Sequence, residues 1–290
     1  MADQFVLANR VYGAVGRRRV LEWLDGQAGY IDDEDFTRSF AGRFALPGVA
    51  EDEYSHRRVH SPNGDLLGGI RFYNRDVRRP FVEVVAHSFA SIDEIRDCVR
   101  VEWSSFRPGF VRLRTAPGAL LTQPNARLHK SIHIGRYADL RTYDGPVTLE
   151  PFEQAVQAIT LVDRRYRKLQ SDDPELAKIL ASASPDELRR WHADGQLYSV
   201  RVRDETVGVL AIVPSSVGWI DGDEVSEEVI DARNNGHGYA AAAQSAWAAQ
   251  IATDRNRLLI GTIHDANVAS RRTAEAVGRV RVLDDYDVAL

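Results

Sequence analysis

The sequence has very little cysteine: Cys98 is the only one among its 290 residues. A lone cysteine cannot form a disulfide within the chain, so a reducing compartment fits and we expect a cytoplasmic protein. No apolar run approaches the roughly 18 residues that a transmembrane helix needs. The segment Met1-Ala2-Asp3-Gln4 does not have the layout of a secretion signal. Neither a membrane span nor a membrane partner is therefore predicted.

Lysine is scarce as well, with only Lys130, Lys168 and Lys178, and the formal net charge is −5. The chain thus lacks the global positive field that attracts nucleic acids, and we expect no nucleic-acid partner. A metal site is not predicted either. His129 and His133 have i, i+4 spacing, but neither a third ligand nor an intervening glutamate accompanies them.

The length suits two medium-sized domains, and we place the boundary between residues 1–145 and residues 146–290. In the first domain, Asn63-Gly64 between two β-prone segments predicts a hairpin. The capping box formed by Ser91 and Glu94 predicts a helix start. The elements expected in this half are helices over 7–25, 33–44, 91–103 and 125–134, and strands over 54–60, 66–73, 81–89 and 110–115.

In the second domain, Ser184-Pro185-Asp186-Glu187 has the cap, the first-turn proline and the third-position glutamate of a helix start. The elements expected in this half are helices over 151–169, 174–182, 184–195, 241–252 and 266–277, and strands over 197–202, 206–213, 225–230, 258–264 and 279–283. This order predicts an α+β fold, in which a mixed α/β sheet carries helices on both faces.

One stretch of the second domain joins a predicted strand to a predicted helix: Arg233-Asn234-Asn235-Gly236-His237-Gly238-Tyr239-Ala240. Its glycines let the backbone approach an anion closely. The first N–H groups of the following helix have no partner within that helix and point outward. The stretch therefore predicts a phosphate-binding turn.

Three features of residues 150–290 resemble the GNAT superfamily of N-acetyltransferases. Arg233-x-x-Gly236-x-Gly238 is similar to the Gln/Arg-x-x-Gly-x-Gly/Ala signature that follows the fourth strand of that family. Asn267-x-x-Ser270-x-x-x-Ala274-x-x-x-Gly278 resembles the helix of asparagine and small residues after the fifth strand. A hairpin strand over 207–212 precedes the glycine turn, as it does in the family.

The resemblance implies a GNAT fold with acetyl-CoA, or another acyl-CoA, as cosubstrate. In the family, the pyrophosphate lies on N–H groups of the signature loop and the pantetheine arm pairs with the end of the fourth strand. Asn267 has an alternative role as a helix cap alone. Carried over residue by residue, the binding roles fall on Val229, Ile230, Arg233, Asn234, Asn235, Gly236, His237, Gly238, Tyr239, Ala240, Asn267 and Ser270.

The first half resembles the second in the order of its segments. Leu66–Phe72 is similar to Thr206–Ile212, and 110–115 followed by Asn125 is similar to 258–264 followed by Asn267. No R-x-x-G-x-G follows the predicted strand over 81–89, so the turn there cannot bring its backbone to a pyrophosphate. We therefore expect two tandem GNAT-like domains, the first of them degenerate. The alternative is an unrelated α/β domain that shares a hairpin.

Acetyl transfer from a thioester to an amine needs a base for the amine and benefits from an acid for the thiolate. Glu228 and Glu227 are the candidate bases. They alternate between the two faces of a strand, and we favour Glu228. The family often has a tyrosine acid where this sequence has Ala274, and Tyr286 is the substitute candidate. The acidic segment 284–290 is a candidate wall for a cationic amine.

The sequence thus predicts an acyl-CoA-dependent N-acyltransferase that transfers acetyl from acetyl-CoA to a primary amine of a small molecule. A first domain that covers the acceptor side favours a small acceptor. Two alternatives stay open: acetylation of protein N-termini or lysines, and a non-catalytic acyl-CoA-binding sensor. We expect a monomer or a homodimer without a metal.

Overall fold

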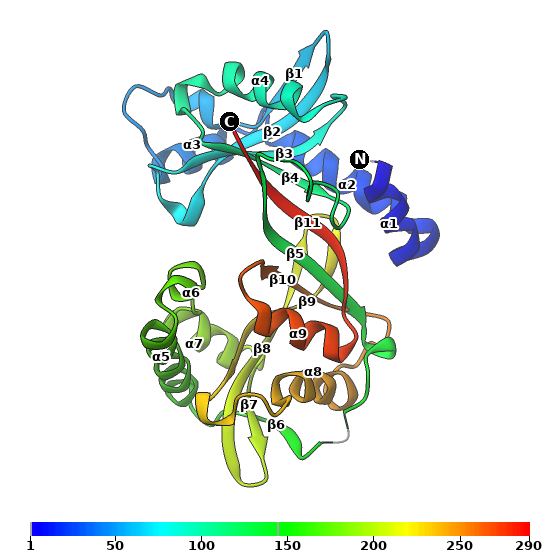
Figure 1. Cartoon of the computed structure of the whole chain (residues 1–290), viewed down its shortest axis with the longest axis vertical. Coiled ribbons are helices and arrows are strands. Elements are labelled where there is room, and N and C mark those ends of the chain that lie inside the picture. The colour runs from blue at the N-terminus through cyan, green and yellow to red at the C-terminus, as the bar shows by residue number, and fades with distance from the viewer. Residues whose placement is uncertain (1, 144) are drawn as a thin grey trace. The chain divides into compact units, whose positions relative to one another are not determined.

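The computed structural model describes residues 2–143 and 145–290, and the chain divides into two compact units (Figure 1). Unit 1 comprises residues 2–130 together with Leu283–Leu290, and unit 2 comprises Ser131–Val282. This division differs from the predicted boundary after residue 145. Strands β5 (Ala126–Arg136) and β11 (Val280–Ala289) each have residues in both units.

Unit 1 is a mixed sheet with helices, and its strand order runs β1-β2-β3-β4-β11. Pairing is antiparallel from β1 to β2 and from β2 to β3, parallel from β3 to β4, and antiparallel from β4 to β11. Its further elements are α1 (Ala2–Tyr12), α2 (Gly16–Gly29), α3 (Glu34–Arg43), β1 (Arg57–Ser61), β2 (Gly64–Phe72), β3 (Pro80–His87), α4 (Ile92–Glu102) and β4 (Phe110–Thr115).

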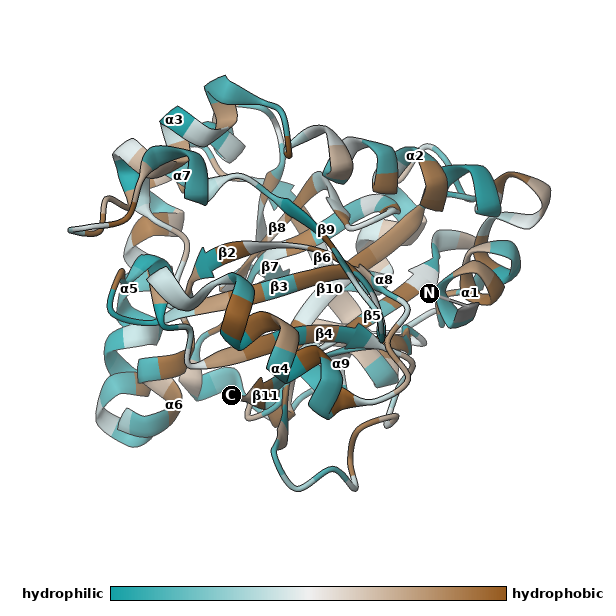
Figure 2. Cartoon of the chain, turned by 90° about the horizontal axis from the view of Figure 1, so that it is seen from above, coloured by the Kyte–Doolittle hydropathy of each residue, from teal (hydrophilic) through white to brown (hydrophobic). Residues whose placement is uncertain are grey.

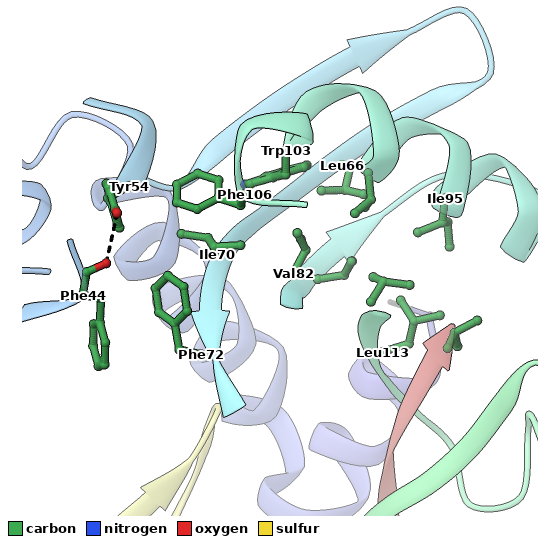
Figure 3. Packing of buried hydrophobic residues seen from close by; sticks show 14 of the residues in the cluster. Phe44, Tyr54, Leu66, Ile70, Phe72, Val82, Ile95, Trp103, Phe106 and Leu113 are labelled. Carbon is green, nitrogen blue, oxygen red and sulfur yellow. Dashed lines mark hydrogen bonds between the residues drawn. The ribbon is translucent and has the colours of Figure 1, made fainter. Parts of the chain in front are cut away.

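The core of unit 1 gathers aromatic and aliphatic side chains from α3, β2, β3, α4 and β4 (Figure 3). Tyr54 is fully buried there, and its hydroxyl donates to the carbonyl of Phe44 at 3.0 Å. The phenol thereby keeps a partner inside an apolar core. Helix α4 has hydrophobic and hydrophilic residues on its two sides (Figure 2), and Ile95 and Val99 are its buried residues.

Two helices predicted in this half are wrong. The predicted helix over 125–134 is the strand β5. Apolar residues at i and i+4 share a face in a strand as well as in a helix, so the spacing of Leu128 and Ile132 did not separate the two. The single helix predicted over 7–25 is two helices, because the chain leaves the helical path at Gly13, where φ is +62°.

Unit 2 also combines mixed strand pairing with helices, and its strand order is β5-β10-β9-β8-β7-β6. Strands 197–202 and 258–264 lie where the sequence predicts them, whereas β8, β9 and β11 are longer than predicted. Its elements are β6 (Val147–Pro151), α5 (Ala155–Asp172), α6 (Pro174–Ile179), α7 (Pro185–Ala193), β7 (Leu197–Val202), β8 (Glu205–Val217), β9 (Ile220–Ile230), α8 (Tyr239–Gln250), β10 (Leu258–His264) and α9 (Val268–Val277).

Helices cover both faces of the sheet in unit 2. On one face, α5 and α7 pack against Val209 and Ala211 of β8 and Val229 of β9. On the other face, the buried alanines of α8 and Val277 of α9 pack against Leu210 and Ile212. Alternate residues of β8 therefore serve two separate hydrophobic cores, as expected for a strand buried on both sides.

The two units repeat one order of elements. In unit 1, β1-β2-β3 is followed by α4 and the parallel strand β4, and in unit 2, β7-β8-β9 is followed by α8 and the parallel strand β10. The mixed α/β fold class and the repeated hairpin are thus confirmed. The repeat ends after β4, because 116–125 forms no helix and Asn125 lies one residue before a strand.

The start of α4 differs physically from a free helix terminus. Ser91 Oγ accepts the N–H of Glu94 at 3.2 Å, and Glu94 Oε2 accepts the N–H groups of Ala90 and Ser91 at 3.1 and 2.9 Å. The chain's own side chains thus bind the N–H groups of Ala90, Ser91 and Glu94 at this helix start and place a negative charge beside them. An anion is therefore not needed at this terminus.

We predict that Ser91→Ala lowers the free energy of unfolding by about 1 kcal/mol, because it removes the helix cap. Urea denaturation followed by far-UV circular dichroism measures the change. Ser104→Ala is the matched control, since the exposed Ser104 hydroxyl makes no hydrogen bond to any residue the structure describes. Equal stability of the two variants would contradict the cap.

Candidate functional site

Strands β9 and β10 part early in unit 2. They pair in parallel only at Asp223 with Leu259 and at Glu224 with Ile260, although β9 continues to Ile230 and β10 to His264. The ladder between β8 and β9 shifts by one residue at the same level, between Ala211 and Ile212. Such a bulge bends the strand that contains it. Beyond Glu224, β9 therefore has a ladder partner on its β8 side only.

The free edge of β9 offers backbone groups to a ligand. The N–H of Asp231 donates to the carbonyl of Val207 on the β8 side at 2.8 Å. Because backbone groups alternate along a strand, the N–H of Val229 also points to β8, and those of Glu228 and Ile230 point to the open edge. Val229 thus contributes its side chain to the site and not its N–H.

The loop after β9 carries the predicted glycine turn. Asp231 begins it by accepting the N–H of Arg233 at 3.3 Å, and Gly236 and Gly238 have φ of +83° and +74°. These are left-handed conformations that favour glycine. Gly238 precedes the first residue of α8, and no side chain caps this helix.

The start of α8 is a run of free donors. Within residues 2–143 and 145–290, none of the N–H groups from Gly236 to Ala241 has a hydrogen-bond acceptor. Six consecutive donors at a helix N-terminus, where the helix dipole is positive, have the arrangement that suits a phosphate group. At α4, by contrast, the Glu94 carboxylate already accepts the N–H groups of Ala90 and Ser91 just before the helix.

A cavity of about 600 Å³ joins the open edge of β9 to this helix terminus. It brings together most residues that the sequence assigned to cofactor binding, along with Glu228. The assigned binding residues that line it are Val229, Ile230, Asn234, Asn235, Gly236, Gly238, Tyr239, Ala240, Asn267 and Ser270.

Arg233 and His237 do not line this cavity. The Arg233 side chain pairs with Asp231 at 3.3 Å and Glu205 at 3.6 Å, and it lines a separate cavity of about 230 Å³. His237 is exposed, with its ring 5.4 Å from that of Tyr239. His237 thus contributes its backbone N–H, and not its imidazole, to the run of free donors.

Asn267 both caps a helix and faces the cavity. Its Oδ1 accepts the N–H of Ser270 at 3.1 Å, which starts α9. Its side-chain amide nitrogen donates to no described residue. The cap role and a binding role are therefore compatible, because they use different atoms of the amide.

Glu228 is the carboxylate that faces the cavity. It is half-buried, and its Oε1 accepts a hydrogen bond from Gln244 Nε2 at 2.8 Å. Burial raises the pKa of Glu228, while the bond from Gln244 and the positive charge of Arg279 oppose that rise. A carboxyl group in a cavity with a raised pKa is a candidate acceptor for a substrate proton.

Glu227 lies on the other face of β9 and does not line the cavity. It is only 5% exposed, and its Oε2 accepts the N–H of Ala183 at 2.8 Å. Its Oε1 accepts the hydroxyl of Tyr166 at 3.4 Å, and Tyr166 does line the cavity. Glu227 is therefore a buried support for Tyr166, and only Tyr166 is open to a ligand.

Tyr286 is not brought to this cavity. It lies in unit 1 on β11, is 1% exposed, and its hydroxyl donates to Asp284 at 3.1 Å. Neighbouring acids on β11 are also occupied: Asp285 pairs with Arg114 and Asp287 pairs with Arg112, both at 2.7 Å. The acidic C-terminal segment thus pairs with the arginines of β4 instead of lining a site for an amine.

The sequence did not single out three kinds of residue that line the cavity or support one that does. Tyr166 follows Val162 and precedes Leu169 on the buried side of α5, so its spacing gave a weak signal. Gln244 is a fully buried polar residue in an alanine-rich helix. The third kind is an apolar wall from α5 and α6 that comprises Leu169, Leu176 and Leu180.

Comparison with known proteins supports the fold but does not identify the reaction. No protein-family model and no curated protein matches the sequence. An acetyltransferase of the GNAT family from Colwellia psychrerythraea has a similar structure, with a TM-score of 0.50 and 9% identity over 88% of this chain and 95% of that chain. This likeness shows the fold alone.

Two further solved structures are more distant. A GCN5-related N-acetyltransferase from Kribbella flavida has a TM-score of 0.44 and 13% identity, over 81% of this chain and 90% of that one. A tandem GNAT protein from the clavulanic acid biosynthesis pathway has a TM-score of 0.43 and 12% identity, over 87% of each chain. The chain has a GNAT fold, as the sequence predicted.

Two negative findings apply to the described part of the chain. No helix among these residues is long and apolar enough to cross a membrane. Among the same residues, no three His, Cys, Asp or Glu side chains are grouped so that they could hold a metal ion.

We predict that Gly238→Val abolishes binding of acetyl-CoA, the ligand that the sequence resemblance implies. A branched side chain is strained at φ +74° and would collide with the Tyr143 hydroxyl beside the free donors. Thermal shift with acetyl-CoA measures binding.

Gly195→Val is the matched control, because Gly195 has φ of +69° and open space around its Cα, and it does not line the cavity. It bears the same backbone strain, so acetyl-CoA should still raise its melting temperature. A full thermal shift in Gly238→Val would refute the assigned loop.

Proposed function

We propose that this chain is an acyl-CoA-dependent N-acyltransferase that transfers acetyl from acetyl-CoA to a primary amine of a small molecule. One observation carries the proposal: the cavity joins six free N–H donors at the start of α8 to the open edge of β9 and to a half-buried carboxylate, Glu228. The donors fit a pyrophosphate, the strand edge fits an extended amide chain, and Glu228 fits a base.

The fit to acetyl-CoA rests on the chemistry of these donors. A diphosphate carries negative oxygens that match the N–H groups from Gly236 to Ala241 and the positive end of the α8 dipole. The pantetheine arm contains amide groups, which can pair with the N–H groups of Glu228 and Ile230 as an added strand would. This orientation directs the thioester away from the glycine turn and along β9 towards Glu228.

Glu228 acts as the base. An amine arrives largely as an ammonium ion, and it must lose a proton before its nitrogen can attack the thioester carbon. Glu228 accepts this proton and passes it to solvent. The nitrogen then forms the amide bond as the carbon–sulfur bond breaks. The sulfur takes its proton from an acid of the site, and the second amine proton restores that acid.

Tyr166 is the acid that we propose in place of the tyrosine missing at Ala274. Tyr166 lines the cavity from the α5 face, where its hydroxyl bonds Glu227, and Gln244 bonds Glu228 on the opposite face. Burial and then the Glu227 carboxylate raise the pKa of Tyr166, so the phenol stays protonated and can donate to the leaving sulfur. Glu227 acts only through Tyr166, by orienting its hydroxyl.

The walls of the cavity favour an amine with an apolar body. Leu169, Leu176 and Leu180 line it from α5 and α6, and Glu228 is the only acidic side chain among its lining residues in the described part of the chain. One carboxylate matches one ammonium group, and the leucines favour an alkyl or aryl substituent. A polyamine would find no second acidic partner there.

We predict that Glu228→Gln lowers kcat/KM about 100-fold or more, because it removes the base. The assay follows free thiol release from acetyl-CoA with a panel of alkylamines, arylalkylamines and polyamines. Glu224→Gln is the matched control: Glu224 lies on the same strand, bonds Ser215 at 2.8 Å and does not line the cavity. Wild-type activity in Glu228→Gln would contradict the assignment.

The same assay separates the alternatives. Turnover of peptides with free N-termini or lysines, but not of small amines, would favour a protein acetyltransferase. Binding of acetyl-CoA without turnover across both panels would favour a sensor. Either result would overturn the proposed acceptor class.

A further inference from the structure

Arg279 is a buried cation in unit 2, near the cavity but outside its lining. It follows the left-handed Gly278 at the end of α9 and is only 4% exposed. Its Nε and Nη1 atoms have no hydrogen-bond partner among the described residues. A charged group is rarely buried without a partner, because desolvation of a charge costs several kcal/mol.

Two glycines on neighbouring strands make room for this side chain. A Cβ at Gly135 of β5 would lie 3.3 Å from Arg279 Cγ, and a Cβ at Gly261 of β10 would lie 2.6 Å from its Nη1. The strand order β5-β10-β9 continues from these glycines to the strand of Glu228. The guanidinium thus extends across the sheet in the direction of β9.

Few other charges compete for this guanidinium. His133 on β5 is buried beside it, and burial, then Arg279, lower the pKa of His133 to about 4, so His133 is neutral at pH 7. Burial lowers the pKa of Arg279 to about 10 and the Glu228 carboxylate raises it, so Arg279 stays charged. Glu228 is thus the anion that offsets its charge.

The surroundings of Glu228 also include other titratable groups. Helix α8 brings neutral Gln244, whose Oε1 has no described partner, and Glu227 lies on the opposite face of β9. No salt bridge within 4.0 Å joins Glu228 to any cation among the described residues. The titratable side chains that line the cavity with Glu228 are Arg165, Tyr166, Tyr239 and Arg272.

We propose that Arg279 is a positioning residue that keeps Glu228 ionised for its role as base, acting across the sheet through charge and without touching the substrate. The inference rests on the proposed function. Burial alone favours the neutral acid, which cannot accept a proton from the amine. A fixed cation behind the carboxylate favours the anion and leaves its cavity side open to the ammonium group.

The test compares pH profiles of kcat/KM in the full-length protein, with the best amine of the panel. Arg279→Gln removes the charge and keeps a polar, though shorter, side chain, and Arg279→Lys keeps the charge. The acidic limb reports ionisation of Glu228, and loss of the cation moves this limb to higher pH. We expect kcat/KM of Arg279→Gln to fall about tenfold on the acidic limb and to recover towards the wild-type value at higher pH.

Arg271→Gln is the matched control, because Arg271 lies on α9 and pairs with Asp265 at 3.5 Å. The acidic limb of the Arg271→Gln profile should stay at the wild-type pH. The acidic limb of Arg279→Lys should move less than that of Arg279→Gln. A merely structural role would lower kcat/KM at every pH without moving the limb, and that outcome would overturn the proposal.

A second readout does not depend on turnover. Carbon-13 NMR of side-chain carboxyl groups, with the Glu228 signal assigned by Glu228→Gln, follows its titration in wild type, Arg279→Lys and Arg279→Gln. A Glu228 titration at higher pH in Arg279→Gln than in wild type supports the inference, and an unchanged titration overturns it. A wild-type protein that acetylates no amine would refute the proposed function, while this titration would still test Arg279.

Discussion

The early parting of β9 and β10 is the constraint on which the site depends. Two residue pairs hold the strands together. Beyond these pairs, the N–H and C=O groups on one edge of β9 have no strand partner among the described residues. Backbone groups inside a protein rarely stay unpaired. An opening in the middle of a sheet, flanked by helices on both faces, is therefore a place where an extended ligand can act as the missing strand.

The same parting lets one ligand reach both faces of the sheet. Glu228 is bonded from the α8 face and Tyr166 comes from the α5 face, and a continuous ladder would keep them apart. The alternation of side chains along β9 also explains why the adjacent Glu227 and Glu228 have different surroundings. Glu227 points to α5, and its carboxylate oxygens accept hydrogen bonds from Ala183 and Tyr166, whereas Glu228 keeps one side open to the cavity.

Local signals in the sequence predicted the loop and the GNAT fold well, because glycine turns, helix caps and short buried strands depend on neighbours in the chain. Features that depend on contacts between distant parts of the sequence were harder to predict. The spacing in 126–136 fits a strand or a helix equally, and Tyr286 is held in unit 1 because β11 pairs with β4. The burial of Arg279 depends on glycines in two distant strands, which no local pattern connects.

The two units share one order of elements but differ in how well the helix after the third strand suits a phosphate group. Helices α4 and α8 follow equivalent strands, but Glu94 binds the N–H groups of Ala90 and Ser91 just before α4, while the donors from Gly236 to Ala241 have no acceptor among the described residues. A carboxylate already fixed at the positive end of a helix repels a second anion as well as competing for its donors. The loss of glycines near residue 90 is thus only part of the difference. Restoring them alone would not create a phosphate site in unit 1, because the charge of Glu94 would remain.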